Sequence, residues 1–95
     1  MIPTLNQVRN MRHALGLEIA QVAYRNCAIH RGEDSDWEQL CVAGLAHKRV
    51  DGINTIYSVS MSGLGWAINP GESIGKEVHD DTYELSVKRI LGVAL

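Results

Sequence analysis

The sequence predicts an α+β domain in which helices pack on a two- to three-stranded antiparallel β-sheet. Two segments combine helix-capping residues with apolar residues at helical spacing. Between residues 45 and 61, two stretches with the composition of strands flank the turn-forming sequence Asp51-Gly52-Ile53-Asn54. The chain has 95 residues, of which 45% are hydrophobic, so it has the length of one domain with a small core.

The first helix is predicted between Thr4 and Gly16. Thr4 and Gln7 have the spacing of a capping box, and Gly16 stands where a left-handed residue ends many helices. The apolar residues that repeat at helical spacing are Leu5, Val8, Met11 and Leu15. We expect this set to face the core, and the opposite side to present Asn6, Arg9, Asn10 and His13 to solvent.

Residues 17–29 fit either a helix or an extended segment. Leu17, Ala20 and Tyr24 suit a second helix, whereas the alternation through Cys27-Ala28-Ile29 favours an extended chain. The favoured interpretation is a short helical turn followed by an extended piece.

A second helix is predicted from Ser35, after a turn at residues 32–34. Ser35 and Glu38 have capping-box spacing, and Gly44 is predicted to end the helix. Its buried stripe is predicted to contain Trp37, Leu40, Cys41 and Leu45.

Two strands are predicted at residues 45–50 and 55–61. Tyr57, Val59 and Met61 alternate along the second strand and should share one face. A short helix capped by Ser62 should follow, and Asn69-Pro70-Gly71 should break it.

The C-terminal part is predicted to be a linker followed by a helix. Residues 71–75 have the composition of a loop, and apolar residues then recur at helical spacing, namely Tyr83, Val87, Ile90 and Leu91. The alternation of Tyr83, Leu85 and Val87 keeps a strand as the alternative. We divide the chain into a domain at residues 1–70 and a linker with a C-terminal helix at residues 71–95. The four apolar residues are candidate dimer contacts, because the helix should pack on the domain or on a dimer partner.

Two resemblances rest on these motifs. The run Leu-x-x-x-Gly-Leu-Ala at 40–46, the basic strand and Tyr-Ser-Val-Ser-Met-Ser at 57–62 resemble the second half of winged helix-turn-helix regulators of the multiple-antibiotic-resistance type. The segments Met-Arg-His-Ala-Leu-Gly-Leu at 11–17 and Tyr-Arg-Asn at 24–26, with that wing, are similar to small uncharacterised phage and prophage proteins. The resemblance implies a winged-helix-like fold. Residues 17–34 are too few for the extra helix of the regulators, so a shortened helix-turn-helix is expected.

Charged residues are grouped along the chain, although the formal net charge is only -2. One run of carboxylates stands at the start of the second helix, where it stabilises the helix dipole and repels a polyanion. We assign these residues as candidate protein contacts: Glu33, Asp34, Asp36 and Glu38.

The candidate nucleic-acid contacts are basic residues on the first helix, between the helices and on the predicted wing. They are Arg9, Arg12, Arg25, Arg31, Lys48 and Arg49. The calculated pI near 6.0 is lower than that of most DNA-binding domains.

No catalytic or metal-binding pattern is evident. Cys27, His30, Cys41 and His47 are residue types that bind zinc, but their spacing is irregular and Cys41 falls on the apolar stripe. The histidines have no carboxylate at a spacing typical of general-base catalysis. We therefore predict no enzyme, no metal site and no cofactor.

The function expected from these patterns is macromolecular binding. The leading hypothesis is a cytoplasmic, non-enzymatic accessory protein of phage or prophage type that binds a host or phage protein, for example as a modulator of a defence or transcription complex. The alternative is a winged helix-turn-helix transcriptional regulator that binds double-stranded DNA as a homodimer. No apolar run approaches the length of a membrane span, so no membrane partner is expected.

Overall fold

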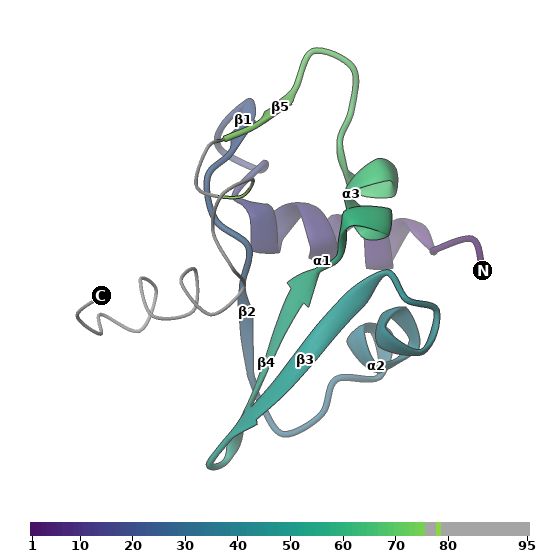
Figure 1. Cartoon of the computed structure of the whole chain (residues 1–95), viewed down its shortest axis with the longest axis vertical. Coiled ribbons are helices and arrows are strands. Elements are labelled where there is room, and N and C mark those ends of the chain that lie inside the picture. The colour runs from purple at the N-terminus through teal and green to yellow at the C-terminus, as the bar shows by residue number, and fades with distance from the viewer. Residues whose placement is uncertain (76–77, 79–95) are drawn as a thin grey trace.

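The computed structural model describes residues 1–75 and 78 and has an α+β architecture (Figure 1). The elements in chain order are α1 (Leu5–Leu15), β1 (Val22–Ala23), β2 (Ala28–Arg31), α2 (Ser35–Val42), β3 (Ala46–Asp51), β4 (Asn54–Val59), α3 (Met61–Ala67) and β5 (Ser73–Ile74). The antiparallel sheet has the strand order β2-β4-β3, and β1 pairs with β5 in parallel. The predicted α+β class and antiparallel sheet are confirmed.

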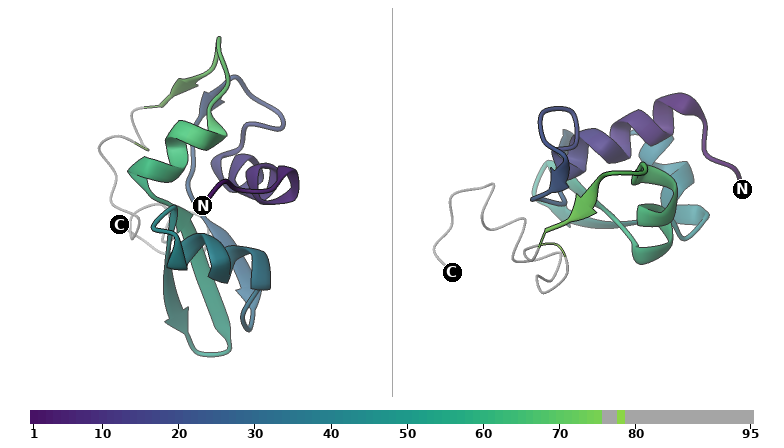
Figure 2. Two further views of the ribbon diagram at one scale, coloured as in Figure 1. Left: turned by 90° about the vertical axis from the view of Figure 1, so that its right-hand side faces the viewer. Right: turned by 90° about the horizontal axis from the view of Figure 1, so that it is seen from above.

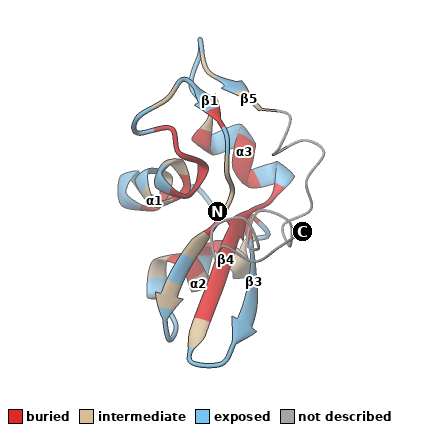
Figure 3. Cartoon of the chain, turned by 90° about the vertical axis from the view of Figure 1, so that its left-hand side faces the viewer, coloured by how far each residue is buried: buried red, intermediate tan, exposed pale blue. Residues whose placement is uncertain are grey.

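The sheet is built around β4, which is buried along most of its length, while β3 is mostly exposed (Figure 3). The β3–β4 hairpin closes with Asp51 opposite Asn54, and Gly52 has a φ of 60° in the two-residue loop. Glycine permits this positive φ without steric cost, as the sequence predicted for the turn.

The core lies between the three helices and the face of β4 that carries Tyr57 and Val59. Trp37 of α2 stacks on Tyr57, with ring centroids 5.4 Å apart and planes 14° from parallel. The helices add buried residues to the same core, namely Met11, Leu15, Leu40 and Leu64. Figure 2 shows α1 and α3 from two further sides, and the two helices contact each other directly.

The prediction that Leu5 of α1 faces the core is wrong. Leu5 is 66% exposed, whereas Gln7 is fully buried. Gln7 can be buried because its side chain is satisfied. Its Oε1 accepts from the backbone N–H of Thr4 at 2.8 Å, and its Nε2 donates to Gln39 Oε1 of α2 at 3.0 Å. The capping box of Thr4 and Gln7 is confirmed, and so is the left-handed Gly16.

The other two predicted helix starts are shifted along the chain. Asp34, not Ser35, caps α2 by accepting from the N–H of Trp37 at 3.1 Å. Ser60, not Ser62, caps α3 by accepting from the N–H of Gly63. Met61 is therefore the exposed first residue of α3 and does not share a strand face with Tyr57.

Residues 17–29, which fit either a helix or an extended segment, fold as the favoured interpretation predicts. Residues 16–19 form a turn, and the chain then runs extended through β1 and β2. The loop expected at 71–75 contains β5 and is bonded to the β1 segment, since Ser73 N–H donates to Gln21 O and Gly75 N–H donates to Ala23 O. The predicted C-terminal helix with Tyr83, Val87, Ile90 and Leu91 lies outside the described residues. No helix in the described part is long and apolar enough to cross a membrane.

Candidate functional site

The four carboxylates predicted as protein contacts lie together at the start of α2, and most of them have partners within the chain. Asp34 caps the helix, and Asp36 accepts from Asn6 Nδ2 of α1 at 2.7 Å. Glu38 accepts from Lys48 Nζ at 2.6 Å and from the Tyr57 hydroxyl at 2.7 Å. Glu33 Oε1 is 3.7 Å from Lys48 Nζ, and Glu33 is more exposed than Glu38, the other carboxylate near this lysine.

The bonds to Glu38 favour its ionised form. The hydrogen bond from Lys48 and, next, that from Tyr57 lower the pKa of the Glu38 carboxyl. Burial, the largest cause, raises the pKa of Tyr57 to about 12, so its hydroxyl remains a donor at neutral pH. The hydroxyl also accepts from the N–H of Asp34 at 3.0 Å, so Tyr57 joins the sheet to the start of α2.

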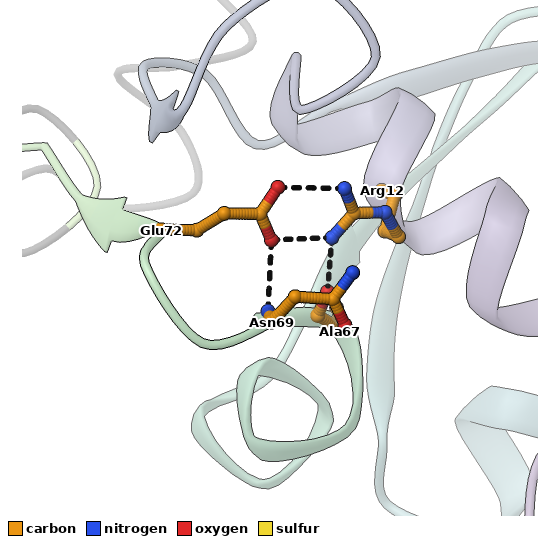
Figure 4. Close-up of polar contacts among 4 residues, drawn as sticks. All are labelled: Arg12, Ala67, Asn69 and Glu72. Atoms are coloured by element: carbon orange, nitrogen blue, oxygen red, sulfur yellow. Dashed lines mark hydrogen bonds and ion pairs between the residues drawn. The ribbon is translucent and has the colours of Figure 1, made fainter.

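Arg12, a predicted nucleic-acid contact, is used inside the molecule. Its guanidinium makes two hydrogen bonds to the Glu72 carboxylate, at 2.5 and 2.6 Å, and a third to the carbonyl of Ala67 at 2.8 Å (Figure 4). The N–H of Asn69 also donates to Glu72. The hydrogen bond from Arg12 is the main reason that the pKa of Glu72 falls to about 2. Arg12 therefore fastens the loop before β5 to α1.

The other predicted nucleic-acid contacts do not form one cluster. Lys48 is paired with Glu38, and Arg25 donates to the carbonyl of His13 at 2.8 Å. Arg9 is exposed on α1. Arg31 and Arg49 are exposed on β2 and β3, which are opposite edges of the sheet. The structure thus distributes these cations over several elements.

A groove that the sequence did not predict lies between the N-terminal residues and α2. We call it the N-terminal groove; it has a volume of about 600 Å³ and is lined by Met1, Ile2, Thr4, Gln7, Glu38, Gln39, Val42 and Ala43. Val42 is 91% exposed and Ile2 is 78% exposed. The available signal was that Val42 falls outside the apolar stripe of its helix.

A second concavity lies between α1 and β2, and we call it the α1–β2 cavity. Its volume is about 320 Å³, and its lining residues are Asn10, His13, Arg25, Cys27, Ala28, Ile29, His30 and Trp37. Burial raises the pKa of the Cys27 thiol to about 11, so this thiol is protonated at neutral pH and is a poor nucleophile. Burial is also the main cause that raises the pKa of Cys41.

Within residues 1–75 and 78, no three His, Cys, Asp or Glu side chains are grouped as they would be around a metal ion. Cys27 and Cys41 are free thiols in separate surroundings, Cys27 against Ile56 and Cys41 against the main core. The set of cysteines and histidines considered for zinc is therefore not brought together.

Comparison of the chain with protein-family models, curated proteins and solved structures found no match, so the geometry of these two concavities and their charges is the basis for a function.

Proposed function

We propose that this chain is a non-enzymatic binding module that contacts another protein through the N-terminal groove and the acidic start of α2. The observation that carries the proposal is the exposure of large apolar side chains at one place, with Ile2 and Val42 both lining a groove of about 600 Å³. Exposed apolar groups that gather beside polar ones are typical of protein-interaction surfaces.

The charges beside the groove define the partner. Glu38 lines the groove with its carboxylate held by Lys48 and Tyr57, and Glu33, five residues earlier in the chain, is 70% exposed. Among the residues that the structure describes, no lysine or arginine lines the groove. A complementary segment would bring apolar side chains into the groove and a lysine or arginine toward the exposed carboxylate of Glu33.

The use of the cations supports a protein partner over DNA. Arg12 and Lys48 are held by Glu72 and Glu38, so binding a phosphate would cost each an existing ion pair. The net charge of -2 also works against a polyanion. More specifically, we propose that the chain is a winged-helix-like accessory protein of phage or prophage type that modulates a host defence or transcription complex. The β3–β4 hairpin supports this proposal because it directly follows α2, where the wing is expected. Only one helix, α2, lies between β2 and β3.

The groove can be tested with a matched pair of substitutions. Val42→Lys places a charge in the groove, whereas Ile53→Lys places the same charge on an exposed apolar residue of the β3–β4 hairpin loop. The immobilised variants are incubated with bacterial lysate, and captured proteins are quantified by mass spectrometry. We expect a protein retained by wild type and by Ile53→Lys to be lost with Val42→Lys. Equal retention by both variants would contradict the groove as the contact surface.

The DNA-binding alternative is favoured by the exposed basic residues of β3, His47, Lys48 and Arg49. It requires that random duplex DNA is retarded in gels at low salt, that retardation decreases steeply as salt rises, and that Lys48→Glu with Arg49→Glu abolishes it. On the protein-binding proposal, wild type leaves the duplex unretarded at low salt.

A further inference from the structure

We propose that the α1–β2 cavity binds a small organic anion carrying a carboxylate or a phosphate group. This inference does not depend on the proposed function, because the cavity shares no lining residue with the N-terminal groove. Its volume of about 320 Å³ is near the lower end of the range, roughly 300–1,000 Å³, of small-molecule pockets.

The polar lining consists of groups that donate hydrogen bonds. Asn10 and His13 of α1 form one wall, and Arg25 and His30 come from the segment that leads into and forms β2. Within residues 1–75 and 78, no aspartate or glutamate lines the cavity. The His13 ring on this wall pairs through Nδ1 with Glu18, which is not among the lining residues.

Arg25 differs from the paired cations in lacking a counterion. Arg12 and Lys48 have carboxylate partners, whereas Arg25 makes no ion pair within residues 1–75 and 78. Its contacts are a hydrogen bond to the carbonyl of His13 and the ring of Tyr24, 5.5 Å from the guanidinium carbon. Its Nε has no partner among the described residues but is fully buried, so a ligand would meet the guanidinium through its other nitrogens. A guanidinium that lines a cavity and has no carboxylate partner among the described residues is a group on which an anion is stabilised by charge and by hydrogen bonds together.

The remaining lining is apolar and aromatic. Ala28 and Ile29 of β2 and the ring of Trp37 complete the cavity. His30 packs edge to face on Tyr57, at a centroid distance of 5.7 Å, so aromatic groups continue from the cavity into the core. An organic anion with an apolar or aromatic body therefore fits this lining better than a bare inorganic ion.

The test is a titration followed by NMR of the whole protein with benzoate, phenyl phosphate, inorganic phosphate and neutral benzyl alcohol, each up to about 10 mM. We expect saturable shifts of the Arg25 Nε–H and of the His13 and His30 rings with benzoate or phenyl phosphate. Preference between these two identifies the acidic group. Equal effects of benzyl alcohol, or no saturable shift with any probe, would overturn the proposal.

Two variants with a control make the assignment specific. Asn10→Asp is nearly isosteric and places a carboxylate on the cavity wall, so it should weaken binding of the preferred probe by about tenfold or more. Gln21→Glu adds the same charge on an exposed residue outside the cavity and should leave binding unchanged. Arg25→Gln should lose saturable binding. If Arg25→Gln does not fold, the contrast between Asn10→Asp and Gln21→Glu decides the result, and equal binding by those two variants would refute the site.

Discussion

Both ends of α1 are closed by residues that lie next to them in the sequence. Thr4, Gln7 and Gly16 satisfy the groups at the two ends of α1, and nothing distant is needed to recognise them. The start of α2 was misassigned because Asp34 and Ser35 are adjacent and both are good caps. The burial of Gln7 could not be predicted, since it depends on Gln39 of another helix.

Gly16 and Gly44 form a matched pair for a first prediction. Both have positive φ, 80° and 78°, but a Cβ at Gly16 would lie 2.3 Å from a ring carbon of Tyr24, while a Cβ at Gly44 would meet nothing within 4 Å. Gly44→Ala should therefore lower the free energy of unfolding by about 1–2 kcal/mol, which is the cost of holding an alanine in the left-handed conformation. Gly16→Ala should lower the free energy of unfolding by about 1 kcal/mol more, because the Tyr24 ring must also move. Urea unfolding measures both, and equal losses would contradict the Tyr24 contact.

At the scale of elements, the closeness of α3 to the start of the sheet makes a second prediction. A Cβ at Gly63 would lie 2.1 Å from the backbone carbonyl oxygen of Leu45, whereas Gly65 in the same helix has open space around it. Gly65→Ala should stabilise the protein by about 0.5–1 kcal/mol through helix propensity. Gly63→Ala should destabilise it by about 1–3 kcal/mol despite the same propensity gain. Thermal unfolding of both variants checks the opposite signs, and a stabilised Gly63→Ala protein would show that α3 packs differently.

The Arg12–Glu72 ion pair makes a third prediction, on pH. The folded pKa of Glu72, about 2, lies below the ordinary value of 4.5. A depressed pKa means that the carboxylate stabilises the fold above its unfolded pKa and that this contribution is lost as pH falls from about 4.5 through 2. Wild type should therefore be more stable than Glu72→Gln at pH 7, and the difference should shrink progressively below pH 4.5. Urea unfolding at several pH values measures it. A difference that stays constant down to pH 2 would argue against the ion pair.

Contacts between elements explain why the sequence was only partly informative at this scale. The β3–β4 hairpin was predictable because its turn is local. The pairing of β2 with β4 was not predictable, since β2 is short and α2 and β3 separate it from β4 along the chain. The role of Arg12 was also hidden, because Glu72 is sixty residues away. The N-terminal groove and the α1–β2 cavity are each lined by separated segments, so composition alone could not indicate them.

For the molecule as a whole, burial and pairing suggest two levels of stability. β4 is hydrogen-bonded to strands on both sides and is buried along most of its length. The β1–β5 pair has two residues in each strand and rests on the Arg12–Glu72 contact and a few backbone bonds. Regions with few buried contacts open without global unfolding, whereas the most buried strands open only with it.

Hydrogen exchange followed by NMR should separate these levels. We expect the amides of Ile56 and Tyr57 to exchange slowest, with opening free energies close to that of global unfolding, and the amides of Ser73 and Gly75 to exchange faster. Glu72→Gln should accelerate exchange at Ser73 and Gly75 more than at β4, because it releases the loop before β5 and leaves the three-stranded sheet paired. If the variant accelerated both sites equally, the loop and the sheet would open as one unit, and the Arg12–Glu72 contact would stabilise the whole domain instead of one attached segment.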